Sequence, residues 1–121
     1  MERFALAGAA AAHTQPFDWG RLHWYASGPL GNSNAQTVGK CVLNPGAANP
    51  KHYHPNCEEV LHVLSGRIEH FIEGEGWLPM SPGDTISVAP NVWHQARNVG
   101  DTEAHLMICF SSKDRQTIGE T

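Results

Sequence analysis

Three side chains that are typical metal ligands lie close together in the sequence, at His52, His54 and Glu59. Because side chains alternate between the two faces of a β-strand, a His-x-His segment in a strand presents both imidazoles on one face. The turn-forming residues 55–57 separate these histidines from Glu59, which begins a second, largely apolar segment. Two imidazole nitrogens and a carboxylate on adjacent strands are suitable ligands for a first-row divalent metal ion. The stretch therefore predicts a metal site with a fourth ligand from elsewhere in the chain.

The elements that must position these side chains are predicted to be short β-strands. The 121 residues suit one domain with a single core, and the 12 glycines and 8 prolines are scattered between apolar segments. Evenly spaced strands and turns of this kind are typical of an antiparallel sandwich or barrel. The expected strands are residues 22–26, 36–43, 52–54, 59–64, 67–72, 77–80, 85–89, 93–98 and 104–110.

A barrel of residues 21–112 is expected, flanked by an arm and a tail. Residues 1–20 include an Ala-rich run and predict a helical or irregular N-terminal arm that packs on the outside. Residues 113–121 begin with charged side chains and predict a C-terminal tail that frays.

The charge distribution argues against a polyanionic partner. The formal net charge is −4 and Lys and Arg form no block, so neither nucleic acid nor a membrane surface is an expected partner. No segment approaches the roughly 20 apolar residues of a membrane span. The widely spaced Cys41, Cys57 and Cys109 argue against a disulfide framework and predict a cytoplasmic protein. A small molecule is the expected partner.

The facing of side chains near the predicted site depends on the turn at residues 65–66. If these two residues form a hairpin turn, Glu59 pairs with Ile72 and Leu61 pairs with His70. The residues expected on the metal-facing side are then Glu59, Leu61, Val63, Ile68, His70 and Ile72. Three apolar side chains then lie on the opposite side, namely Val60, Leu64 and Phe71. They require cover from the arm or from a second subunit. A slip of one residue would move His70 to the outside.

Two separated segments resemble the two signature motifs of the cupin superfamily. The first motif is matched in full by Gly46, His52, His54, Glu59 and Gly66. The second is matched by residues 83–98, except that Ala89 stands where proline is usual and Asn91 stands where glycine is usual. Asparagine tolerates the left-handed backbone that glycine would adopt, so the turn is expected to survive this exchange.

The resemblance implies an all-β jelly-roll barrel, usually a homodimer, with one divalent metal ion held inside by three histidines and a glutamate. Carried over to this sequence, the implied ligands are His52, His54, Glu59 and His94. Electrostatics agree, because a carboxylate inside a barrel costs several kcal/mol to desolvate unless a cation compensates its charge. Mixed nitrogen and oxygen ligands suit Mn, Fe, Ni, Co or Zn.

The expected function is that of a metal-dependent enzyme acting on a small anionic molecule by an oxygenase-type or Lewis-acid reaction, with a dioxygenase as one candidate. Whether the site is catalytic stays open at this point, since a noncatalytic binding or sensory protein and a sugar isomerase are alternatives. His70 is the candidate catalytic proton carrier, although a buried structural histidine explains it about as well. Gln95 and Asn98 are candidates for orienting His94.

Overall fold

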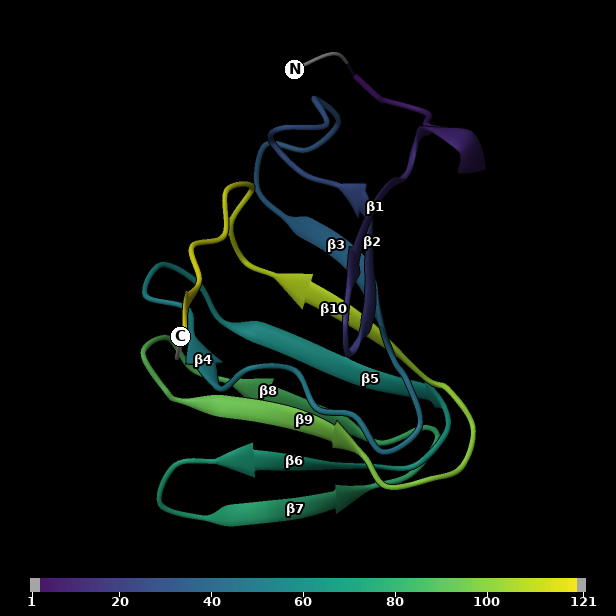
Figure 1. The fold of residues 1–121 in the computed structure, drawn as a ribbon. Helices are drawn as coiled ribbons and strands as arrows, with labels where there is room; N and C mark the ends of the chain where they lie inside the picture. Colours follow the sequence, from purple (N-terminus) through teal and green to yellow (C-terminus); the bar gives the residue numbers. More distant parts are fainter. Residues whose placement is uncertain (1–2, 120–121) are drawn as a thin grey trace.

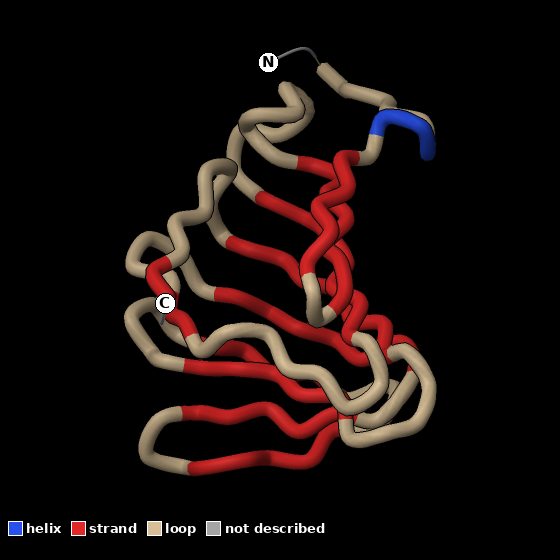
Figure 2. Tube along the Cα trace, viewed as in Figure 1, coloured by secondary structure: helices blue, strands red, loops and turns tan. Residues whose placement is uncertain are grey.

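The computed structural model describes residues 3–119. Apart from one short turn of 3₁₀-helix at Ala9–Ala11, the regular structure of these residues consists of strands (Figure 2). The strands are β1 (His13–Phe17), β2 (Gly20–Ala26), β3 (Thr37–Leu43), β4 (His52–Tyr53), β5 (Glu59–Ser65), β6 (Ile68–Ile72), β7 (Gly76–Met80), β8 (Thr85–Val88), β9 (His94–Asn98), β10 (Ala104–Phe110) and β11 (Ile118–Gly119). No helix within the described part of the chain is long and apolar enough to cross a membrane.

The strands form two antiparallel sheets that share one core (Figure 1). One sheet contains six strands in the order β1-β2-β3-β10-β5-β8, and the other contains five in the order β11-β4-β9-β6-β7. From β3 onward, consecutive strands such as β4 and β5 lie in different sheets, except for β6 and β7, which pair with each other. This alternation between sheets is the arrangement of a jelly roll, so the predicted all-β jelly-roll fold is confirmed.

The core follows from the alternation of side chains along each strand. In β10, four alternate residues are buried, namely Ala104, Leu106, Ile108 and Phe110. The same apolar cluster includes Trp24, Cys41, Leu43, Leu61 and Val63 from the six-stranded sheet, and Ile68, Met80 and Ala96 from the five-stranded sheet. Because a large apolar side chain contributes about 1.5–3 kcal/mol when it is fully buried, this cluster holds the two sheets together.

The expected hairpin between β5 and β6 is wrong. β5 pairs with β8 and β10, whereas β6 pairs with β7 and β9 in the other sheet. The chain passes between the sheets at Gly66, whose φ of 85° lies in the left-handed region that favours glycine. The predicted inward facing still holds for Leu61, Val63, Ile68 and His70, while Ile72 is only half-buried. The predicted facing of these side chains is still correct, because side chains alternate between the two faces within each strand, whichever strand it pairs with.

Both ends of the chain are more regular than the sequence predicts. Residues 13–17 of the expected helical or irregular arm form β1, which pairs with β2. Residues 118–119 of the expected tail form β11, which pairs with β4 next to the ligand segment. Each segment adds an edge strand and satisfies backbone groups that a sheet edge would otherwise leave open. Residues 1–2 of the predicted arm and residues 120–121 of the predicted tail lie outside the described residues.

The arm does not cover the outward-facing apolar residues near the site. It pairs with β2, and Leu64 in β5 remains 47% exposed. Phe71 in β6 is half-buried and packs against Trp77, with 5.5 Å between the ring centroids. Cover by a second subunit therefore stays a prediction.

Candidate metal centre

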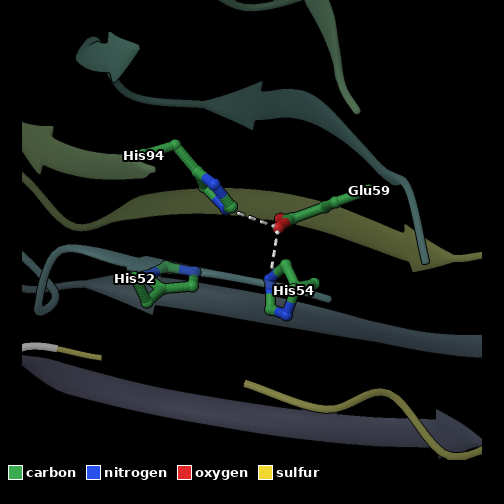
Figure 3. Close-up of side chains that lie close together, drawn as sticks. All are labelled: His52, His54, Glu59 and His94. Carbon is green, nitrogen blue, oxygen red and sulfur yellow. Dashed lines mark hydrogen bonds and ion pairs between the residues drawn. The ribbon is translucent and has the colours of Figure 1, made fainter. Parts of the chain in front are cut away.

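The four predicted ligands converge from both sheets. His52 lies in β4, His54 directly follows this strand, and His94 begins β9 opposite His52. Glu59 begins β5 in the other sheet. One ligand atom from each of these four residues lies within 4.8 Å of the others (Figure 3). The fold therefore brings together all four residues that the two sequence motifs indicated.

Each of the three imidazoles is oriented by a backbone carbonyl group. The Nδ1 atom of every ring lies at hydrogen-bond distance from a carbonyl oxygen, so Nδ1 carries the proton and donates it. The neutral ring then has its lone pair on Nε2, which is the form that binds a metal ion. The Nδ1 to oxygen distances are 2.7 Å for His52 and Pro50, 2.8 Å for His54 and Gln116, and 2.9 Å for His94 and Val92.

The Nε2 atoms of two histidines face the same carboxylate oxygen. Oε1 of Glu59 lies 3.1 Å from Nε2 of His54 and 3.0 Å from Nε2 of His94 (Figure 3). With Nδ1 already donating to a carbonyl, a neutral ring would present a lone pair to this negative oxygen, and two acceptors at that distance repel each other. A cation between them removes the repulsion. Two ligand atoms that are each about 2.1 Å from one ion at a right angle are about 3.0 Å apart, so the spacing fits a first-row divalent metal.

Two of the three pKa shifts resolved among the ligands favour the protonation states that a metal site needs. Burial would raise the pKa of Glu59, but in the metal-free site its contacts with the imidazoles of His54 and His94 together outweigh burial and lower the pKa well below its ordinary value. Burial and the neighbouring His94 lower the pKa of His52 to about 4. Burial is the strongest single influence on His94 and acts to lower its pKa, but the hydrogen bond to Glu59, the charge of Glu59 and the Val92 carbonyl together outweigh burial, so this pKa is raised. At neutral pH the site therefore combines an ionised carboxylate with a neutral His52, and protons compete for Nε2 of His94 more strongly than for that of His52.

A cavity of about 330 Å³ opens beside the ligands. His52, His54 and Glu59 form part of its wall. Most of the remaining wall is apolar, and it comprises Phe17, Trp19, Leu22, Trp24, Cys41, Pro50, Leu61, Ile108 and Phe110. A concave, largely apolar site with a few polar groups is typical of small-molecule binding. The polar members of the wall outside the ligand set are Gln15, Asn49, Arg115 and Thr117.

His70 lies next to the ligand set without joining it. Its ring stacks on the ring of His94, with 5.5 Å between the centroids, and burial lowers the pKa of His70 to about 4. His70 faces inward, as predicted, but it is not among the residues that line the cavity. Its Nδ1 atom is buried and has no hydrogen-bond partner among residues 3–119. The predicted role as proton carrier stays a prediction.

The two residues expected to orient His94 form hydrogen bonds with other groups. Gln95 donates from Nε2 to the carbonyl oxygen of Asn49, and Asn98 donates from Nδ2 to the carbonyl oxygens of Leu43 and Thr102. The prediction that Gln95 and Asn98 orient His94 is therefore wrong. Successive residues of a strand face opposite sides, so Gln95 points away from the ligand. Asn98, three residues further along, links the end of β9 to Leu43 and Thr102 instead.

The sequence did not predict which groups orient the imidazoles, nor that the tail contributes one of them. The orienting groups are backbone carbonyls, which every residue possesses, so no side-chain pattern indicates them. Gln116 and Thr117 both approach His54, with Thr117 Oγ1 3.2 Å from Nδ1. One sequence feature could have pointed to this part of the tail. Arg115 lies beside Gln116, and the chain has only 8 Lys and Arg residues, so a cation here stands out.

Comparison with known proteins agrees with the fold and the ligand set. A family model described as a cupin domain matches residues 39–110. The polyketide synthase CurC of Streptomyces cyaneus is 34% identical over 74 residues, which cover 61% of this chain and 47% of that protein. An oxalate decarboxylase of Lactobacillus farciminis, solved as a formate complex, has a TM-score of 0.83 at 17% identity, covering 91% of this chain and 34% of that one.

A second solved structure concerns the Mn(II) centres of Bacillus subtilis oxalate decarboxylase. It has a TM-score of 0.81 at 19% identity and covers 88% of this chain and 29% of that one. The chain spans about half the length of the curated relatives that it matches. At these identities the solved structures support the fold, whereas the family model covers most of the described barrel. The chain belongs to the cupin family.

Proposed function

We propose that this protein is a metal-dependent enzyme acting on a small anionic molecule. The observation that carries the proposal is the convergence of His52, His54, Glu59 and His94, whose ligand atoms lie within 4.8 Å of one another. Three of these ligands also line a largely apolar cavity of about 330 Å³. A ligand cluster at the wall of a cavity is suited to act on a molecule that enters the cavity.

The four side chains would hold one divalent ion with a net charge of about +1 once the carboxylate is counted. When bound, such an ion acts as a Lewis acid or a redox centre toward an oxygen atom of the substrate. The backbone carbonyls keep the imidazole rings in the metal-binding tautomer, and the apolar wall limits access of water. His70, which stacks on His94, is the nearest additional base.

Mn, Fe, Ni, Co and Zn all suit this ligand set. The Mn(II) centres of Bacillus subtilis oxalate decarboxylase support Mn as the first metal to test. The formate complex of the Lactobacillus farciminis enzyme supports a carboxylate as the class of ligand. An oxygenase-type or Lewis-acid reaction on a small organic acid is therefore the activity that we propose.

Elemental analysis of protein purified without chelators tests the metal site. We expect about one divalent ion per chain, and we expect His94→Ala to reduce the metal content at least about tenfold because one ligand is lost. His62→Ala is the matched control, since His62 lies on the same strand as Glu59 and bonds to Thr85 instead. Wild-type protein purified without bound metal, or a metal content in His94→Ala equal to that of the wild type, would contradict the proposal.

Turnover assays then separate an enzyme from a binding protein. Metal-loaded protein is mixed with organic acids, keto acids and phenols, and oxygen uptake and products are followed by an oxygen electrode and NMR. Product formation that His94→Ala abolishes supports the enzyme. Saturable ligand binding without turnover would instead favour the noncatalytic alternative.

We also propose that the protein is a cytoplasmic homodimer. The 47% exposure of Leu64 on the outer face of the six-stranded sheet supports an additional contact there. Light scattering over a range of protein concentrations tests the oligomeric state, and a monomer at every concentration would contradict it.

A further inference from the structure

Arg115 lies at the junction of two cavities. The cavity beside the metal ligands, about 330 Å³ in volume, and a second cavity of about 810 Å³ share four wall residues: Gln15, Trp24, Arg115 and Thr117. The second cavity is formed between the N-terminal segment, the loop at residues 27–30 and the tail at residues 113–117. A molecule in either cavity therefore meets the side chain of Arg115.

The guanidinium group of Arg115 is held in place by rings and by a hydroxyl group. Its Cζ atom lies 4.3 Å from the centroid of the Trp24 ring and 5.2 Å from that of Phe110. Its Nη1 donates to Oγ1 of Thr117, which in turn approaches His54. Stacking and hydrogen bonding of this kind preorganise the planar guanidinium group.

This cation has no acidic partner of its own among residues 3–119. Two other arginines do have one, because Arg21 pairs with Glu103 and Arg97 pairs with Glu69. Burial lowers the pKa of Arg115 and the charge of Glu59 acts to raise it, although a guanidinium group stays protonated at any physiological pH. Glu59 pairs with His54 and His94 and makes no ion pair with Arg115, so the partly desolvated guanidinium favours an anion that supplies one.

We infer that Arg115 binds the carboxylate of the substrate, and that the substrate is an organic acid with an apolar body. A guanidinium group matches a carboxylate with two parallel hydrogen bonds. The aromatic and aliphatic wall of the metal cavity suits an aryl or alkyl group. This inference rests on the proposed function and adds to it the apolar body of the organic acid and the residue that binds its carboxylate.

Isothermal titration calorimetry with four probes tests the inference. Benzoate and hexanoate carry the carboxylate, and benzamide and hexanamide are their neutral counterparts. We expect metal-loaded wild-type protein to bind each acid about 10- to 100-fold more tightly than its amide, as a charge-assisted hydrogen bond provides. No saturable binding of either acid, or equal binding of acid and amide, would overturn the inference.

Three variants assign the effect to Arg115. Arg115→Met keeps an unbranched apolar stem against Trp24, and it should remove the preference for acid over amide. Arg115→Lys keeps the charge without the planar fork and should retain part of the preference. Arg97→Met is the matched control, because Arg97 stacks on Trp77 at 3.8 Å on the opposite sheet and lines neither cavity. Unchanged acid binding in Arg115→Met, with a normal thermal melt, would refute the assignment.

Metal content distinguishes this inference from the proposed function. Each variant is analysed for bound metal, and the titrations are repeated on chelator-treated protein. Wild-type protein that binds no metal but retains acid binding dependent on Arg115 would defeat only the proposed function. Normal metal content together with acid binding that ignores Arg115 would defeat only the inference.

Discussion

Nδ1 of His54 lies 2.8 Å from the carbonyl oxygen of Gln116, a residue 62 positions later in the chain. The tail is thus part of the metal centre, because it sets the orientation of one ligand ring. Asn56 holds the tail in this position, since its Nδ2 donates to the carbonyl oxygen of Asp114 and its Oδ1 accepts from the Gln116 amide, both at 2.9 Å. A loop residue next to the ligands therefore connects the tail to the site.

Asn56→Ala should weaken metal binding about tenfold, because loss of a group that orients a ligand typically costs 10–100-fold in affinity. Competition with a chromogenic chelator measures the change. Gln116→Ala is the control, since its amide and carbonyl contacts come from the backbone and should persist. Wild-type affinity in Asn56→Ala would show that the tail does not orient His54.

Gly66→Ala should lower the free energy of unfolding by roughly 2–4 kcal/mol. At this corner φ is 85°, and an added Cβ would lie 2.8 Å from Cα of Ala104. Gly46→Ala should cost only about 1 kcal/mol, because φ is 74° but no atom lies within 4 Å of the added Cβ. Urea denaturation measures both values. Equal losses in the two variants would contradict the close packing at Gly66.

Metal-free protein should lose stability as the pH falls from 6.5 toward 4. Burial lowers the pKa of His52 and of His70 to about 4, from 6.5. In this interval the unfolded chain binds more protons than the native chain, so the free energy of unfolding rises with pH. Each of these two pKa shifts corresponds to roughly 3 kcal/mol in the free energy of unfolding. This contribution is fully present above pH 6.5 and is lost near pH 4.

Urea denaturation of chelator-treated protein between pH 4 and pH 8 measures this dependence. His70→Leu should remove about half of the slope, because one of the two imidazoles with the largest shifts is gone. A flat profile in the wild-type protein would contradict the burial of neutral imidazoles. The same variant, loaded with metal and assayed for turnover, also tests the predicted role of His70 as proton carrier.

Cys41 should resist alkylation in the native protein at pH 8. Burial raises its pKa to about 12, so only about one thiol in 10⁴ is ionised at that pH. Cys109 is half-buried on the same sheet and serves as the comparison. Peptide mapping after treatment with iodoacetamide should find Cys109 modified before Cys41, with both modified in urea. Equal labelling rates in the native protein would count against the burial of Cys41.

The sequence by itself determined the ligand set and the inward facing of its strands. The resemblance of two segments to the cupin motifs implies the ligands His52, His54, Glu59 and His94, and the structure places them together. Side-chain alternation is a local property of a strand, which is why Leu61 and His70 were correctly expected to face inward. The left-handed backbone at Asn91, with φ of 68°, also followed from the preference of asparagine for that region.

The tertiary structure decided which strands pair and what surrounds the ligands. The turn at residues 65–66 suggests a hairpin locally, but burying the apolar faces of both sheets sends β5 and β6 into different sheets. The carbonyl of Gln116 and the cation of Arg115 reach the site because β11 pairs with β4 and Asn56 bonds to the tail. Pairing between distant segments depends on the whole chain, so the sequence pattern predicted the metal ligands, whereas the fold supplied the groups that orient them and line the cavity beside them.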